Sequence, residues 1–353
     1  MKKWLKVALC ILLAVVLLVG GYVAYVFIDY HRLGDMTLTP THNAGAAESG
    51  TVYTMISYNI GFGAYESDYG FFMDGGTESR AWSKERLTKN LTAISTFLQE
   101  QDADFYLLQE VDTGATRTYQ VDERAYFTEA LSGMSWVYCQ NYDSPYLMYP
   151  LFKPHGASHA GLMTFSTADI AAASRVELPI EGGFMKLLDL DRCYSVSRIP
   201  VSGCKELVLY NLHLSAYTSD GTIATEQLKL LLADMQAEYE SGNWCVAGGD
   251  FNKDLLGDSA AWFGEADQSY SWAQPIPAET FAGVDISLAA PLDENDPVPS
   301  CRNADGPYHE GQYVLTVDGF LTTPNVTVSQ ATVLDTGFAW SDHNPVKMTF
   351  TLS

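Results

Sequence analysis

The sequence predicts an α/β fold: one large domain of strands and helices that follows an apolar helix at the N-terminus. The chain has 353 residues, and residues 7–28 form a run without a charged side chain. Beyond residue 50, short apolar runs typical of strands alternate with two segments whose apolar residues recur at helical spacing. The length of this second region suits a single α/β or β-rich domain.

The N-terminal apolar run is long enough to cross a bilayer, which takes about 20 residues as a helix. A cleaved signal peptide is the alternative, with a shorter apolar core and a small-residue cleavage site. Here Tyr22, Tyr25 and Phe27 follow the core instead. Lysines at positions 2, 3 and 6 precede the run, so the positive-inside rule places the N-terminus in the cytoplasm. Residues 1–32 are therefore predicted to be cytoplasmic lysines and a single-pass anchor in the cell membrane, with an extracellular domain beyond.

Residues 33–50 are predicted to be a linker with little structure. They contain Pro40, Gly45 and many threonine, alanine and serine residues, a composition that favours an irregular tether. The folded domain is then expected to span residues 51–353.

The formal charge of −23 limits the classes of partner. Such acidity argues against affinity gained by neutralising many phosphates of a long nucleic acid. It does not exclude a nuclease, because a bound metal supplies local positive charge that the net charge ignores. The cysteines form no C-x-x-C pair or Cys/His cluster that would indicate zinc. One or two disulfides are possible in an extracellular domain, but the sequence does not pair them.

The first part of the domain predicts a strand, a loop, a helix and a second strand. Residues 53–59 are β-branched and aromatic and end at Asn59, before two glycines. Residues 65–82 have no clear period and are expected to be a loop. Apolar residues recur at helical spacing from Ser83, a capping residue, to about Glu100. Residues 105–110 form the second apolar strand, which ends at Glu110.

The middle of the domain predicts further strands and a second amphipathic helix. Residues 138–152 are expected to be loop-rich, and their aromatic side chains either pack beneath the loop or face a substrate. Strands are expected at 161–165, within 183–198 and at 206–214. Residues 227–239 have helical periodicity and lead to an apolar strand at 244–247.

The last part predicts an irregular segment followed by two strands. Residues 254–307 are rich in Pro, Gly, Asp and Asn. Residues 314–321 are expected to form a strand with Asp318 in its middle, and residues 346–352 alternate as a final strand. Because a buried Asp without a partner is costly, Asp318 is expected to pair with another side chain.

Polar residues end four of the apolar runs and can gather in one cleft if the strands pack sheet on sheet. These residues are Asn59, Glu110, His213 and Asp250 with Asn252, and two later stretches add Asp318 and the Asp342-His343 pair. Each has a plainer interpretation: residues 248–252 could form a tight surface turn, and His213 could be a packed core histidine. Carboxylates and carboxamides without thiolates suit a hard cation such as Mg²⁺, and two histidines with carboxylate partners suit proton transfer.

Six short stretches resemble the endonuclease/exonuclease/phosphatase superfamily, which includes deoxyribonuclease I, the abasic-site exonucleases, neutral sphingomyelinases and inositol polyphosphate phosphatases. They are S-Y-N-I at 57–60, L-Q-E-V at 108–111, N-L-H-L at 211–214, G-D-F-N at 249–252, V-D-G-F at 317–320 and S-D-H-N-P at 341–345. Each motif is weakly specific alone, but all six occur in the family's order. The abasic-site branch tends to carry Tyr where His213 stands, so the chain looks closer to the other branches.

The resemblance implies a four-layer sandwich of two face-to-face mixed β-sheets with helices outside. It implies that Glu110 is the principal Mg²⁺ ligand, with Asn59 and Asp342 near the metal and Mn²⁺ as a possible substitute. His343, oriented by Asp318, would activate or position the attacking water or receive charge from the phosphate. Asp250 and Asn252 would orient the nucleophile and phosphate oxygens, and His213 would bind phosphate or protonate the leaving oxygen.

The leading hypothesis is a membrane-anchored, outward-facing Mg²⁺-dependent phosphoesterase that hydrolyses a phosphodiester or phosphomonoester of a lipid head group or small molecule. The alternative is an extracellular nuclease acting on DNA or RNA. A non-catalytic binding domain is a third class, but a binder has no need of two histidines, metal-type carboxylates and an Asp-x-Asn pair together. The expected partners are the phosphoester substrate and the membrane, and no protein partner is predicted.

Overall fold

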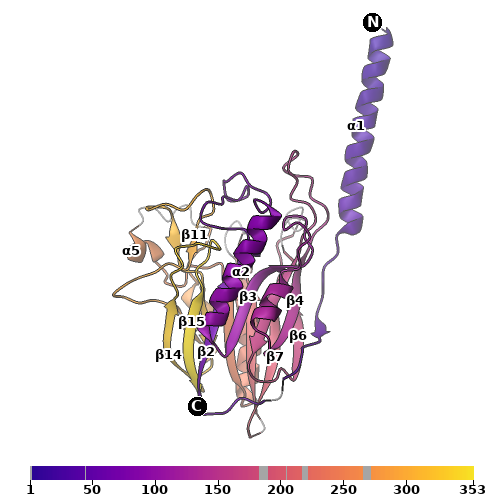
Figure 1. Ribbon diagram of the computed structural model, residues 1–353. Coiled ribbons are helices and arrows are strands. Elements are labelled where there is room, and N and C mark those ends of the chain that lie inside the picture. Colours follow the sequence, from indigo (N-terminus) through magenta and orange to yellow (C-terminus); the bar gives the residue numbers. More distant parts are fainter. Residues whose placement is uncertain (1, 44, 183–189, 204, 217–221, 265–271) are drawn as a thin grey trace.

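The computed structural model describes residues 2–43, 45–182, 190–203, 205–216, 222–264 and 272–353. Figure 1 shows a single helix, α1, standing away from a body of strands and shorter helices. α1 spans Lys2–Asp29. Among the described residues it is the one helix long and apolar enough to cross a membrane, a property that it shares with signal sequences.

The first sheet of the body has six strands in the order β14-β15-β2-β3-β5-β4. β2 and β3 run parallel, and the other neighbours run antiparallel, so the sheet is mixed. The strands are β2 (Val52–Asn59), β3 (Phe105–Asp112), β4 (Ser135–Asp143), β5 (His159–Ser166), β14 (Val326–Val333) and β15 (Val346–Leu352).

The second sheet has seven strands in the order β1-β6-β7-β8-β9-β13-β10 and is also mixed, because β8 and β9 run parallel. A separate pair, β11 (Cys301–Arg302) and β12 (Val314–Leu315), lies outside both sheets. The seven strands are β1 (Met36–Leu38), β6 (Ala172–Glu177), β7 (Cys193–Val201), β8 (Lys205–His213), β9 (Trp244–Asp250), β10 (Ser287–Ala289) and β13 (Asp318–Thr322).

The two sheets pack face to face with helices on their outer sides. Successive side chains of a strand point to opposite faces, so Phe105 and Leu107 lie between the sheets while Tyr106 and Leu108 lie in the outer core. The outer core of the six-stranded sheet is covered by α2 (Lys84–Gln101), with α3 (Arg124–Ala130) beside it. α4 (Thr222–Glu240) covers the outer face of the other sheet. This is the expected four-layer sandwich, and burial on both faces explains why its strands are continuous apolar runs.

Residues 33–43 and 45–50, for which composition favoured an irregular tether, contact the domain at several points. β1 pairs antiparallel with β6, Ala47 forms a bridge with Val201, and the side-chain amide of Asn43 donates to two carbonyls of the domain. Composition did not indicate β1, because a three-residue edge strand owes its stability to its partner strand and leaves little local signal.

Three other expectations differ from the structure in detail. β4 occupies the first part of the stretch 138–152 that was expected to be loop. The strand expected within 183–198 begins only at Cys193, and residues 183–189 lie outside the described residues. Asp318 is the first residue of β13, not the middle of a continuous strand, because β12 ends at Leu315 and two residues separate the strands.

Candidate active site

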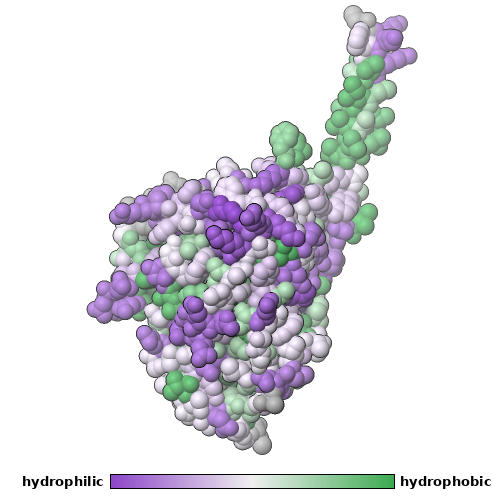
Figure 2. Space-filling view, viewed as in Figure 1, coloured by the Kyte–Doolittle hydropathy of each residue, from purple (hydrophilic) through white to green (hydrophobic). Residues whose placement is uncertain are grey.

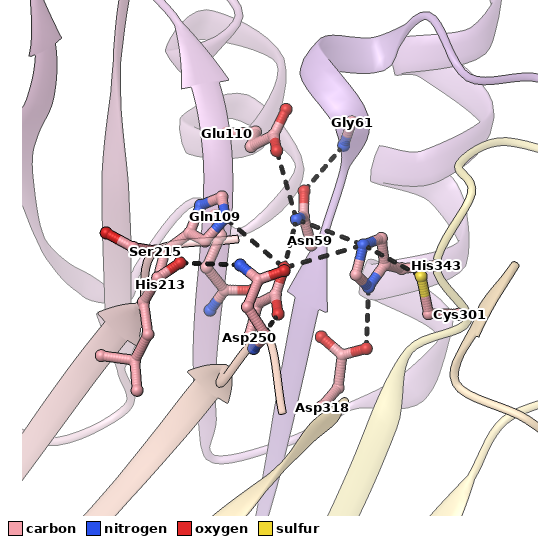
Figure 3. A network of polar contacts seen from close by, with 12 residues as sticks. Asn59, Gly61, Gln109, Glu110, His213, Ser215, Asp250, Cys301, Asp318 and His343 are labelled. Atoms are coloured by element: carbon pink, nitrogen blue, oxygen red, sulfur yellow. Dashed lines mark hydrogen bonds and ion pairs between the residues drawn. The ribbon is translucent and has the colours of Figure 1, made fainter. Parts of the chain in front are cut away.

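Neighbouring strand ends gather the predicted polar residues at one end of the sandwich (Figure 3). His213 ends β8 and is the register partner of Asp250, which ends β9. Asp318 begins β13 and lies opposite Asp250. From the facing sheet, Asn59 ends β2 and Glu110 lies near the end of β3.

The two glycines before Asp250 belong to β9 and do not form a surface turn. A Cβ atom on Gly248 would lie 2.8 Å from side-chain atoms of Leu107 and Phe320, and one on Gly249 would lie 2.0 Å from the Leu212 carbonyl oxygen. Glycine is therefore needed because the facing sheet and the neighbouring strand approach the backbone closely.

His343 and Asp318 form a buried pair. The His343 Nδ1 atom lies 2.7 Å from Asp318 Oδ2, and the Ser300 hydroxyl donates to the same oxygen at 2.8 Å. Burial alone would lower the pKa of His343, but the carboxylate of Asp318, with Cys301 and Asp250, holds it well above its ordinary value. The expectation that Asp318 has a partner is confirmed.

Asp250 is the centre of the network. Its Oδ2 atom accepts a hydrogen bond from Asn59 Nδ2 at 3.0 Å and lies 3.5 Å from His213 Nε2 and 3.7 Å from His343 Nε2. Its Oδ1 atom accepts from the Asn252 backbone N–H at 2.8 Å. Burial raises the pKa of Asp250 to about 7, although His343 acts to lower it.

His213 is buried at the edge of the site. Burial, with Arg192 and His343 nearby, holds its pKa well below the ordinary value of histidine. Among the described residues, none forms a hydrogen bond with its Nδ1 atom. The ring therefore borders a cavity and differs from a packed core histidine whose polar atoms are satisfied.

Asn252 lies in the left-handed region, with φ of 49°. Its side-chain amide donates to the Leu214 carbonyl at 2.7 Å, which ties the chain after β9 to the chain after β8. Asn252 borders the same cavity as Asp250.

Glu110, Asn59 and Asp342 form the oxygen-rich side of the site. Glu110 sits in an irregularity of the β3–β5 pairing with φ of 58°, a strained conformation that is common at functional sites. Its Oε1 atom accepts from Asn59 Nδ2 at 3.3 Å. Burial raises the pKa of Glu110, Arg117 lowers it and Asp342 raises it further. Burial also raises the pKa of the Asp342 carboxyl.

These oxygens fit a hard divalent cation. Mg²⁺ prefers carboxylate and amide oxygens, and a cation would relieve the unfavourable proximity of two partly buried carboxylates. A second group, Asp250, Asp318 and His343, has potential ligand atoms within 4.8 Å of one another. In that group Asp318 Oδ2 and His343 Nδ1 already bond to each other, so neither atom is free to bind a cation without breaking that contact.

The site borders a cavity of about 120 Å³. Besides the predicted residues, its wall includes arginines and aromatic rings that the sequence analysis did not assign to the site: Arg117, Arg192, Phe62, Phe71 and Trp272. Cys301 also borders it, with its Sγ atom 3.6 Å from His343 Nε2. Arg302 is buried and donates to the carbonyls of residues 66, 69, 303 and 306.

Comparison with solved structures finds the same fold in several proteins. An endonuclease/exonuclease/phosphatase from Beutenbergia cavernae has a TM-score of 0.55 and 17% identity, covering 86% of this chain and 72% of that one. Truncated Caenorhabditis elegans TDP2 has a TM-score of 0.52 and 15% identity, with 86% and 98% covered. ANGEL2, a 2′,3′-cyclic phosphatase in complex with adenosine-2′,3′-vanadate, has a TM-score of 0.55 and 16% identity, with 90% and 99% covered.

Comparison with curated proteins finds no match. The model of the Endonuclease/Exonuclease/phosphatase family matches residues 56–343, which include every residue of the predicted site. The chain therefore belongs to the endonuclease/exonuclease/phosphatase family of metal-dependent phosphoric ester hydrolases.

Proposed function

We propose that the chain is a membrane-anchored, outward-facing Mg²⁺-dependent phosphoesterase whose substrate is a phosphoester of a lipid head group or small molecule. The observation that carries the proposal is the meeting of the His343–Asp318 pair, Asp250 and His213 beside the carboxylates of Glu110 and Asp342, around one cavity. A phosphoester hydrolase needs groups for nucleophile, leaving oxygen and phosphoryl charge in one place.

Each residue has a role that follows from its position. Glu110, Asn59 and Asp342 would hold the cation, which when bound supplies positive charge to the phosphoryl oxygens. Asp318 fixes the His343 ring through Nδ1 and leaves Nε2 beside Asp250.

His343 Nε2 then activates or positions the attacking water, or contacts a phosphoryl oxygen. Asp250 and Asn252 orient the attacking water. His213, on the other side of Asp250, binds the phosphate or protonates the leaving oxygen.

The arginines of the domain favour a small substrate over a nucleic acid. A nuclease would be expected to have a basic strip beside its cleft. Four arginines scattered in the sequence are instead engaged with carboxylates or a backbone carbonyl: Arg80 with Pro154, Arg86 with Glu66 and Asp68, Arg117 with Asp112, and Arg124 with Asp122. Arg117, Arg192 and Arg302 border the cavity, but arginines gathered at one cavity do not make a strip along a cleft.

The catalytic part of the proposal is tested with full-length protein in detergent and a soluble aryl phosphodiester with Mg²⁺. We expect His343→Ala to lower kcat/KM by about 10²- to 10⁴-fold, the range of a lost acid or base. His309→Ala, at an exposed histidine, is the matched control and should retain activity. Equal rates for wild type and His343→Ala would refute the assignment. A panel of phospholipid, DNA, inositol phosphate and nucleoside 2′,3′-cyclic phosphate then separates the substrate classes.

The anchor is tested separately in intact cells. We expect the full-length chain to stay in the membrane fraction after alkaline extraction and its domain to be cleaved by protease added outside. An N-terminus that begins after residue 29 in the purified protein would show instead that the helix is a cleaved signal.

A further inference from the structure

The loop between β4 and β5 ends in a group of exposed apolar side chains, which we name the apolar tip. Its members are Met148, Tyr149, Leu151 and Phe152, of which 49%, 70%, 70% and 99% are exposed. Removing apolar surface from water is worth about 25 cal/mol per Å², so a contiguous group of this kind marks an interaction site.

The loop that carries the apolar tip is bonded to the last turns of α1. The Tyr22 hydroxyl donates to the Tyr146 carbonyl at 3.1 Å and accepts from the Met148 N–H at 3.1 Å. The Tyr25 hydroxyl accepts from the Tyr146 N–H at 3.0 Å. Figure 2 shows an apolar protrusion of the body beside the apolar surface of the helix. Tyrosines at the end of an apolar helix are typical of the membrane–water interface.

The base of the same loop is fixed and reaches the active site. Leu147 and Gly156 exchange two backbone hydrogen bonds, of 3.1 and 3.0 Å. His155, the next residue toward the tip, borders the catalytic cavity. The Tyr149 ring packs against Phe72 at 5.6 Å between centroids, and the neighbouring Phe71 and Met73 also border the cavity.

The active site lies at the end of the sandwich that faces α1. β2 runs antiparallel to β15, with Val52 paired to Thr351, so Asn59 lies at the end opposite the C-terminus. Figure 1 shows the C-terminus at the bottom of the body, and α1 and the β4–β5 loop at the top.

We propose that the apolar tip inserts into the bilayer that holds α1, at the boundary of head groups and acyl chains, and so holds the cavity against the membrane surface. The occupant is lipid because the helix bonded to the loop has itself the length and composition of a membrane span. The proposal rests on the proposed function and gives its substrate class: the phosphodiester of a phospholipid head group in the same membrane.

Insertion is tested with full-length protein in nanodiscs of phosphatidylcholine and phosphatidylglycerol. Brominated acyl chains quench the fluorescence of a tryptophan that lies among them. We expect them to quench the fluorescence of Phe152→Trp more than that of the wild type in the same lipids. Val52→Trp is the matched control, because Val52 is 63% exposed at the opposite end of the domain, and it should not be quenched. Failure to quench the residue at 152 would overturn the proposal. A second result would also overturn it: a blue shift of the fluorescence emission of Phe152→Trp that is already present in detergent and grows with protein concentration. A second copy of the chain would then cover the apolar tip.

The link to substrate is tested with Leu151→Ser/Phe152→Ser. We expect hydrolysis of phospholipid in vesicles to fall at least about tenfold, because membrane affinity scales with buried apolar area. Hydrolysis of the soluble aryl phosphodiester should be unchanged, since neither side chain touches the site.

The two proposals fail in different ways. If wild type hydrolyses no phosphoester at all, the proposed function fails, while quenching still reports insertion. If the aryl phosphodiester is hydrolysed but the double variant cleaves vesicle phospholipid as fast as wild type, the membrane proposal fails alone.

Discussion

His155 is a buried neutral histidine, and its two ring bonds explain why. Nδ1 lies 2.8 Å from the Ser79 carbonyl oxygen and so carries the proton, while Nε2 lies 3.2 Å from the Ser158 hydroxyl. Burial, with Arg117 as the next cause, lowers the pKa of His155 to about 3. The unfolded chain therefore binds a proton between pH 6.5 and 3 that the folded chain does not, and stability is lost as the pH falls through this window.

Because of this histidine, the free energy of unfolding should be about 2 kcal/mol lower at pH 5 than at pH 7. We expect His155→Gln, which has no ionisable ring, to lose less stability between pH 7 and pH 5 by about that amount. Urea unfolding at both pH values measures the difference. If the free energy of unfolding changed with pH equally in the two proteins, burial would not lower the pKa of His155.

Asp318 contacts His343 Nδ1 at 2.7 Å, and under the proposed function it is a positioning residue that acts through that ring. Asp318→Asn keeps the shape of the side chain but removes the negative charge beside the His343 ring. The amide oxygen of the asparagine can still accept the hydrogen bond from the Ser300 hydroxyl. We expect kcat to fall by about 10²- to 10⁴-fold with KM changed little, because Asp318 is not among the residues that border the cavity. A KM effect without a kcat effect would place Asp318 in substrate binding instead.

The sequence identified site residues where polar groups end apolar runs. Asn59, His213 and Asp250 are such cases, since a strand end in a sandwich opens toward the cleft. Arg192 and Cys301 could not be found in this way. They reach the site from short or irregular segments, and only the packing of distant strands brings them to the cavity.

At the scale of elements, Cys139 of β4 and Cys193 of β7 bring two free thiols together between the two sheets. Both are buried, and their Sγ atoms lie 3.6 Å apart. In an oxidising compartment outside the cell, thiol–disulfide oxidants should take two electrons and two protons from this pair and form a bond between the sheets.

The free thiols are alkylated at harvest so that disulfides cannot form later. Peptide mapping should then recover the peptides of Cys139 and Cys193 joined by a disulfide. Reduction by dithiothreitol should then lower stability by about 2–4 kcal/mol, whereas Cys139→Ala/Cys193→Ala should be insensitive to the reductant. Full alkylation of both thiols in the harvested protein would contradict this prediction and, with it, the extracellular localisation.

Elements with strong periodicity were predictable, and short edge strands were not. The helix from Ser83 matches α2, whose N-terminus is capped by the Ser83 hydroxyl accepting from the Arg86 N–H. β1, β10 and β11 have two or three residues each. A run of two or three residues is too short to show hydrophobic periodicity. Its pairing depends on a partner strand that is distant in sequence.

At the scale of the whole molecule, the fold concentrates negative charge at the proposed cation site. The chain has a net charge of −23, and Glu110 and Asp342 bring two of its carboxylates together at one end of the sandwich. A cation bound only by the folded state stabilises that state, by about 2.7 kcal/mol at a concentration of 100 times its Kd.

We therefore expect Mg²⁺ to raise the Tm of the chelator-treated protein and to restore hydrolysis of the aryl phosphodiester, with Mn²⁺ able to replace it. Glu110→Gln should lose both the Tm increase and the activity, because an amide is a poorer ligand and carries no charge. Glu129→Gln is the control, since Glu129 lies on α3, away from the site. If Glu110→Gln kept the full Tm response to Mg²⁺, the cation would bind elsewhere, and Asp250, Asp318 and His343 would become the ligands to test.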